Sequence, residues 1–134
     1  MPERKTVERA RQDKREGKAP TTQAGEFVRE EMDHIRAGKH GARSTKQAIA
    51  IGLAKARRAG VKLKPPKKGQ ASARTRKSAE RDYKAGTSGA TKKPSAARSR
   101  AATRALEREP KSAASHKALS THAHAVAVRR RRAR

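Results

Sequence analysis

The chain has 134 residues, with 37 Lys and Arg against 12 Asp and Glu, which gives a formal net charge of +25. It has no cysteine, which excludes disulfides and cysteine zinc sites. No apolar run approaches the length of about 20 residues that a membrane span requires, and the first residues form no apolar signal region. We therefore expect a cytoplasmic protein without a membrane partner.

The excess of positive charge indicates a polyanionic partner. Like charges repel one another in a compact chain, and a bound polyanion removes that repulsion while its own counterions are released. Nucleic acid is the commonest such partner inside a cell. The sequence therefore predicts nucleic-acid binding.

Residues 1–20 are predicted to form a charged N-terminal helix. Its residues 3–16 are mostly Glu, Arg, Lys and Gln, which favour helix, and Gly17 is the expected stop. Only Val7 and Ala10 are apolar, so we expect this helix to be marginal in isolation.

Residues 21–64 contain a predicted helical hairpin at about 21–60. The first helix begins at Thr21 or Thr22 and ends before Gly38. Its apolar side chains recur at helical spacing and form one stripe. They are Ala24, Phe27, Val28, Met32 and Ile35.

The second helix of the hairpin carries several signals that agree with one another. Ser44 and Gln47 fit a capping box, with serine at N-cap and glutamine at N3. Gly60 is the expected left-handed cap, and Val61 supplies the hydrophobic contact of a Schellman motif. The predicted apolar side consists of Ala48, Ile49, Gly52, Leu53 and Ala56.

Residues 65–134 form a basic, low-complexity region with 20 basic and 4 acidic residues. Alanine gives the segments 72–85, 95–109 and 112–128 helical propensity, but their few large side chains form no continuous stripe. We expect a largely disordered arm whose nascent helices become firm on binding. The predicted fold class is therefore all-α, with a polar N-terminal helix, a small hairpin and this arm.

The hairpin resembles a known family. Residues 25–41 are followed by the helix K-Q-A-I-A-I-G-L-A-K-A-R, and this pattern is similar to that of a bacterial family of small basic proteins of unknown function. The resemblance covers about residues 24–64. It implies a bacterial source and, because some members are described as DNA-binding, a DNA-binding role. The tail resembles those of linker-histone-like proteins by composition only.

Two interpretations of the turn at residues 38–43 remain open. Backbone N–H groups at a helix N-terminus attract anions, and Lys39 and Arg43 flank the turn, which suits a DNA phosphate. The other interpretation, which we favour, is a plain helix–helix connection with a glycine cap. A helix-turn-helix would use a turn of about three to four residues, so we expect little sequence-specific reading.

The residues that could perform catalysis or bind metal form no recognisable set. No cysteine or carboxylate cluster completes a metal site with the five histidines, which are His34, His40, His116, His122 and His124. No serine has an evident base and orienting acid. We predict no catalytic residue, no metal site and no cofactor.

The sequence thus predicts a non-enzymatic, nucleoid-associated, histone-like protein that binds duplex DNA through its phosphates with little sequence preference. One alternative is a structured-RNA or ribosome-associated protein. Another is a helical interaction module that forms a homodimer through a Phe27/Ile49/Leu53 face. The residues predicted to contact nucleic acid are Lys39, Arg43, Lys46, Lys55, Arg57, Arg58, Lys62, Lys64, Lys67, Lys68, Lys92, Lys93, Arg129, Arg130, Arg131 and Arg132.

Overall fold

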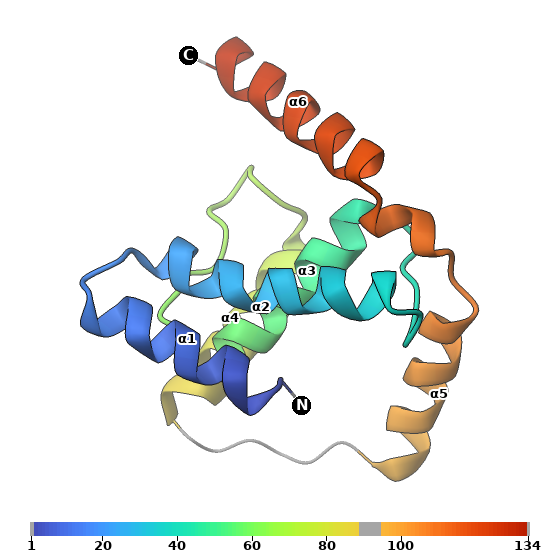
Figure 1. The fold of residues 1–134 in the computed structure, drawn as a ribbon. Helices are drawn as coiled ribbons and strands as arrows, with labels where there is room; N and C mark the ends of the chain where they lie inside the picture. Colours follow the sequence, from blue (N-terminus) through green and yellow to red (C-terminus); the bar gives the residue numbers. More distant parts are fainter. Residues whose placement is uncertain (1, 89–94, 134) are drawn as a thin grey trace. The chain divides into compact units, whose positions relative to one another are not determined.

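The computed structural model describes residues 2–88 and 95–133, and these residues form helices and no strand, which confirms the all-α prediction (Figure 1). None of these helices combines the length and apolar character needed to cross a bilayer. The helices are α1 (Arg4–Arg15), α2 (Pro20–Arg36), α3 (Thr45–Arg58), α4 (Ala73–Ser88), α5 (Ala96–Glu107), the short 3-10 helix η1 (Lys111–Ala114) and α6 (His116–Arg132).

The chain divides into two compact units. Unit 1 combines Met1–Glu30 with Ala50–Lys93, and unit 2 combines Glu31–Ile49 with Pro94–Arg134. Helices α2 and α3 each contribute to both units. The segment expected to form the hairpin module therefore supplies residues to each of them.

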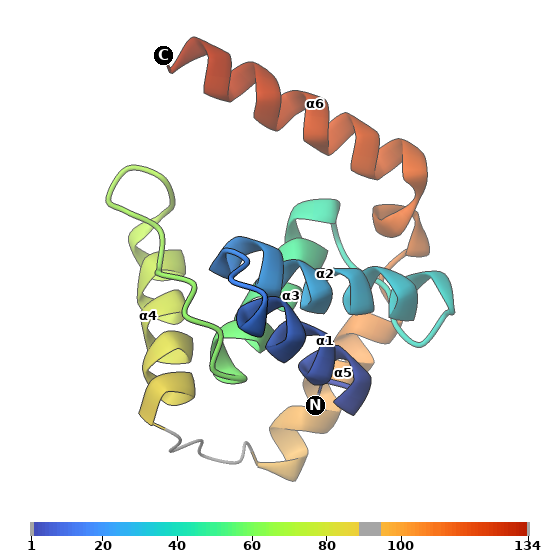
Figure 2. The ribbon, with the colours of Figure 1, turned by 60° about the vertical axis from the view of Figure 1, so that its left-hand side comes forward.

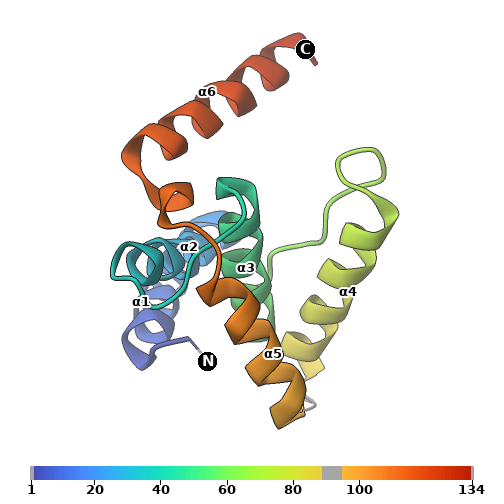
Figure 3. The same cartoon turned by 90° about the vertical axis from the view of Figure 1, so that its right-hand side faces the viewer.

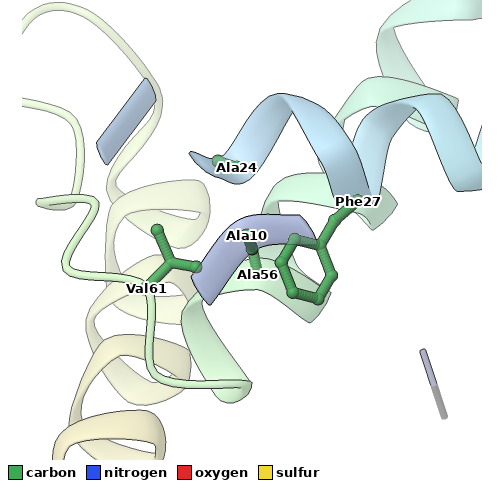
Figure 4. Packing of buried hydrophobic residues seen from close by; sticks show 5 residues of the cluster. All are labelled: Ala10, Ala24, Phe27, Ala56 and Val61. Carbon is green, nitrogen blue, oxygen red and sulfur yellow. The ribbon is translucent and has the colours of Figure 1, made fainter. Parts of the chain in front are cut away.

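The core of unit 1 is built from small side chains around one aromatic ring (Figure 4). Phe27 of α2 is only 1% exposed and shares a cluster with Ala10 of α1 and Ala56 of α3. Val7 packs against the same cluster, so both apolar residues of α1 are used in packing. Because alanine buries little area, backbones must approach closely to exclude water. Gly52 allows this, since a side chain there would collide with the backbone of Val28.

Buried Glu30 of α2 joins α1 to α2. Its Oε1 accepts hydrogen bonds from the backbone N of Glu3 at 2.5 Å and from the hydroxyl of Thr6 at 3.1 Å. These contacts lie at the N-terminus of α1, where backbone N–H groups lack helical partners.

Glu30→Ala is expected to lower the free energy of unfolding by about 1–3 kcal/mol, because it leaves these two donors without their acceptor. Chemical denaturation followed by circular dichroism measures the change. Glu30→Gln keeps one acceptor oxygen and should restore most of the stability, and exposed Glu8→Ala is the control. A Gln variant as unstable as the Ala variant would contradict the role of this acceptor.

The predicted C-terminal ends of α2 and α3 are confirmed by their hydrogen bonds, whereas α2 begins at Pro20, before the predicted threonine start. At α3 the N–H of Val61 donates to Ala56 O at 3.0 Å and that of Gly60 donates to Arg57 O at 3.1 Å, the two bonds of a Schellman motif. Gly60 has a φ of 100°, which suits glycine. Gly38 ends α2 with a φ of 81° and an equivalent pair of bonds.

The start of α3 differs slightly from the predicted capping box. Ser44 Oγ accepts from Gln47 N at 3.1 Å, as expected. The Gln47 side chain, however, accepts from Arg43 N at 2.5 Å, one residue before the N-cap.

The prediction of a largely disordered arm at 65–134 is wrong, since α4, α5, η1 and α6 occupy most of its described residues. The predicted helical segments at 72–85 and 95–109 are confirmed in position, whereas the third helix begins at His116, four residues later than predicted. Serines cap the three α-helices: Ser72, Ser95 and Ser115 each accept a backbone N–H. Capping and alanine propensity favour these helices locally. In unit 1, α4 also packs through Ala79, which is buried, and through Gly86. Small residues thus replace the stripe of large side chains that the sequence lacks.

Candidate nucleic-acid interface

Helix α4 carries a row of exposed positive charges, which we call the α4 stripe: Arg74, Lys77, Arg81 and Lys84. At 3.6 residues per turn, this spacing places the four within about 80° of the helix circumference. The ion pairs of the described residues include none of the four. Their charge is therefore available to a partner.

The opposite side of α4 faces the rest of unit 1. Ala79 is buried, and Arg76, Tyr83 and Gly86 are at least partly buried. At Gly86 the helix meets the end of α3 so closely that a Cβ would overlap the carbonyl oxygen of Arg57. This contact fixes which side of α4 is exposed.

The linker between α3 and α4 adds four exposed lysines that the sequence predicted, Lys62, Lys64, Lys67 and Lys68. The linker runs beside α4 in both Figure 2 and Figure 3. Prolines 65 and 66 suit an extended conformation there. The linker and the α4 stripe therefore concentrate positive charge in one part of unit 1.

Arg57 is positioned inside unit 1. It is only 8% exposed, and its guanidinium donates from Nε to Leu63 O at 3.1 Å and from Nη2 to Lys64 O at 3.3 Å. Burial lowers the pKa of Arg57, and the nearby charge of Asp82 acts in the opposite direction. We therefore treat Arg57 as a residue that positions the linker. Its neighbour Arg58 is exposed and lies 3.8 Å from a carboxylate oxygen of Asp82.

In unit 2, the turn at 38–43 is held by the last turn of α5 and the segment that follows it. Gly41 N donates to Leu106 O at 2.8 Å, and Ala42 N donates to Pro110 O at 3.1 Å. These N–H groups, and that of Arg43, have acceptors within the chain, which favours the plain connection over a backbone phosphate site. The side chains of Lys39, Arg43 and Lys46 are exposed, so any contact here comes from them.

The remaining predicted residues are distributed as follows. Arg129, Arg130, Arg131 and Arg132 form the exposed last turn of α6, a helix without buried or acidic residues. Lys55 is half-buried. Lys92 and Lys93 lie outside the described residues.

The prediction omitted the α4 stripe and a second row on α5, where Arg100, Arg104 and Arg108 follow one another at four-residue spacing. Both rows are readable as helical periodicities in the sequence. They were missed because only nascent helices were expected in this segment, and side chains on a helix that is not stably formed hold no fixed positions.

Residues 21–69 match the model of a family of unknown function, DUF6496. This range spans α2, the turn, α3 and most of the linker, and it confirms the resemblance to a family of unknown function. No curated protein and no solved structure matches the chain.

Proposed function

We propose that this protein binds duplex DNA through its phosphates, with little sequence preference, as a non-enzymatic, histone-like component of the bacterial nucleoid. The observation that carries the proposal is the α4 stripe beside the lysine-rich linker. From Arg74 to Lys84 the stripe is about 15 Å long, at 1.5 Å per residue. Four to five base pairs of duplex, at about 3.4 Å each, cover that length.

The distribution of charged and aromatic residues supports contact with the backbone over stacking on bases. The chain has one Phe and one Tyr; Phe27 is buried in unit 1, and Tyr83 is half-buried on the inner side of α4. Single-strand binders stack successive bases on several aromatic side chains. Arginine and lysine that contact phosphates position a protein without reading sequence.

The dimer alternative has less support from the burial of its residues. Phe27 is 1% exposed within the core of unit 1, and Leu53 packs against the same core. Both side chains are thus used in intramolecular packing. We therefore prefer the nucleic-acid proposal.

Unlabelled duplexes of unrelated sequence are expected to displace a labelled duplex of about 30 base pairs with affinities within about tenfold, because phosphate contacts carry no sequence information. Fluorescence anisotropy at low salt measures the competition. A single-stranded DNA of the same length and an RNA hairpin are the comparison ligands.

Absence of duplex binding at low salt would overturn the proposal. A preference well above about tenfold for one DNA sequence would overturn the sequence-tolerant mode. A comparable preference for the RNA hairpin would assign the protein to structured RNA.

A further inference from the structure

Three potential metal ligands that are separated in the sequence come together in unit 2. Glu31 and His34 lie three residues apart on α2, which places them on the same face of the helix, and His40 lies in the turn that follows. One ligand atom from each residue lies within 4.8 Å of the other two. The nearest pair is His40 Nε2 and Glu31 Oε2, at 3.2 Å.

The orientation of His40 is set by the backbone. Its Nδ1 is 2.9 Å from the carbonyl oxygen of Gly41, which can only accept a hydrogen bond, so Nδ1 carries the proton. In the neutral ring Nε2 is then an acceptor, and it faces a carboxylate oxygen that is also an acceptor. Such a contact is favourable when a proton or a cation lies between the two atoms.

The same arrangement is typical of a histidine that binds metal. Metal-binding imidazoles generally donate their second ring N–H to a carbonyl or carboxylate, which fixes the tautomer and the direction of the ligand nitrogen. The Glu31 side chain is fully buried and that of His40 is 14% exposed, so the two ligands are shielded from water. Burial strengthens the attraction between a carboxylate and a cation.

We infer that Glu31, His34 and His40 form a binding site for a divalent transition-metal ion, Zn²⁺. Two imidazoles and one carboxylate are a ligand set that Zn²⁺ accepts, and they leave its fourth position for water. In a tetrahedral site, bonds of about 2.0–2.2 Å place the ligand atoms about 3.3–3.6 Å apart. The Glu31–His40 pair is already near that spacing. The ligand atom of half-buried His34 lies within 4.8 Å of the other two, and a rotation of its side chain would bring it to the ion.

A metal ion at this position would fasten the last turns of α2 to the turn at 38–43. That turn also donates backbone hydrogen bonds to the segment after α5. The ion would therefore stabilise a connection that the chain otherwise makes with a few hydrogen bonds. This role is independent of the proposed DNA binding.

The test uses the full chain after treatment with a chelator. Isothermal titration with Zn²⁺ is expected to show one site per chain, and saturation should raise the melting temperature by at least about 4 °C. Co²⁺ should give the visible absorption of a tetrahedral site. His34→Gln, His40→Gln and Glu31→Gln should each weaken Zn²⁺ binding at least about tenfold, since even outer-shell partners contribute that much.

The matched control is His122→Gln with His124→Gln, which removes two histidines of α6 and should leave the affinity unchanged. Circular dichroism without metal establishes whether each variant is folded. If the variants at Glu31 and His40 do not fold, the Zn²⁺ affinity of His34→Gln tests the inference by itself. Equal Zn²⁺ affinity in the His34 variant and the wild type would overturn the inference. So would binding without a rise in melting temperature, because an ion held at a site of the folded chain must stabilise the folded state.

Discussion

Replacing the four residues of the α4 stripe by glutamine is expected to remove most of the salt dependence of duplex binding. Non-specific affinity falls with salt at a logarithmic slope of about −0.9 per phosphate contacted. If about six phosphates are contacted, raising salt from about 50 to 200 mM weakens binding on the order of a thousandfold. Loss of four of these contacts would leave a fall of only about tenfold over the same range.

The control removes the same number of charges from another exposed helix, through glutamine at Lys5, Arg9, Arg11 and Arg15 of α1. Acidic residues such as Glu8 lie among these side chains and compete with DNA for them. The slope should therefore change little. A third variant replaces the four arginines at the end of α6 and is expected to reduce the slope in part. If the stripe variant keeps the full slope while the α6 variant loses it, unit 2 contains the principal contact.

Gly86→Ala is expected to destabilise the protein by about 3 kcal/mol, the upper end of the range for overpacking. The added Cβ would overlap the carbonyl oxygen of Arg57 and would lie 3.0 Å from the backbone N of Gly60. Both neighbours are backbone atoms, so no side-chain rotation relieves the collision. Helix α4 must move away from the end of α3, or the contact is lost.

The matched control is Gly25→Ala in α2, where an added Cβ meets nothing within 4 Å. Alanine favours helix over glycine by about 1 kcal/mol, so this variant should be more stable than the wild type. Chemical denaturation should therefore show that the exchange of glycine for alanine lowers the free energy of unfolding at Gly86 and raises it at Gly25. Equal effects at the two positions would show that the approach of α4 to α3 does not limit stability.

Measurement of DNA binding by Gly86→Ala distinguishes the effect of the positive charges from the effect of their arrangement on the folded chain. The variant keeps every basic side chain, so a loss of affinity would indicate that the stripe must be docked beside the linker. The anisotropy titration should be carried out at a temperature where circular dichroism shows the variant to keep the helix content of the wild type. Unchanged affinity would mean that the charges alone are sufficient.

The sequence determined the features that depend on neighbouring residues. Ser44 and Gln47 marked the start of α3, and Gly38 and Gly60 marked helix ends, because capping involves groups only a few residues apart. Helical periodicity likewise identified the buried apolar residues of α2, including Phe27, but not the buried carboxylates of Glu30 and Glu31. The excess charge, which needs no structure, led to the nucleic-acid hypothesis.

Tertiary structure decided what depends on contacts between distant residues. The arm was expected to be disordered because it lacks large apolar side chains. Its helix α4 nevertheless packs through Ala79 and Gly86, and such small residues form no hydrophobic stripe that could be recognised in the sequence. Arg57 is indistinguishable from Arg58 in sequence, and only the path of the linker carbonyls makes it a buried positioning residue. His40 approaches Glu31 because the chain turns after Gly38, and the direction of that turn is fixed by hydrogen bonds from Gly41 and its neighbour to a segment more than sixty residues away. Local patterns contain no information about such contacts.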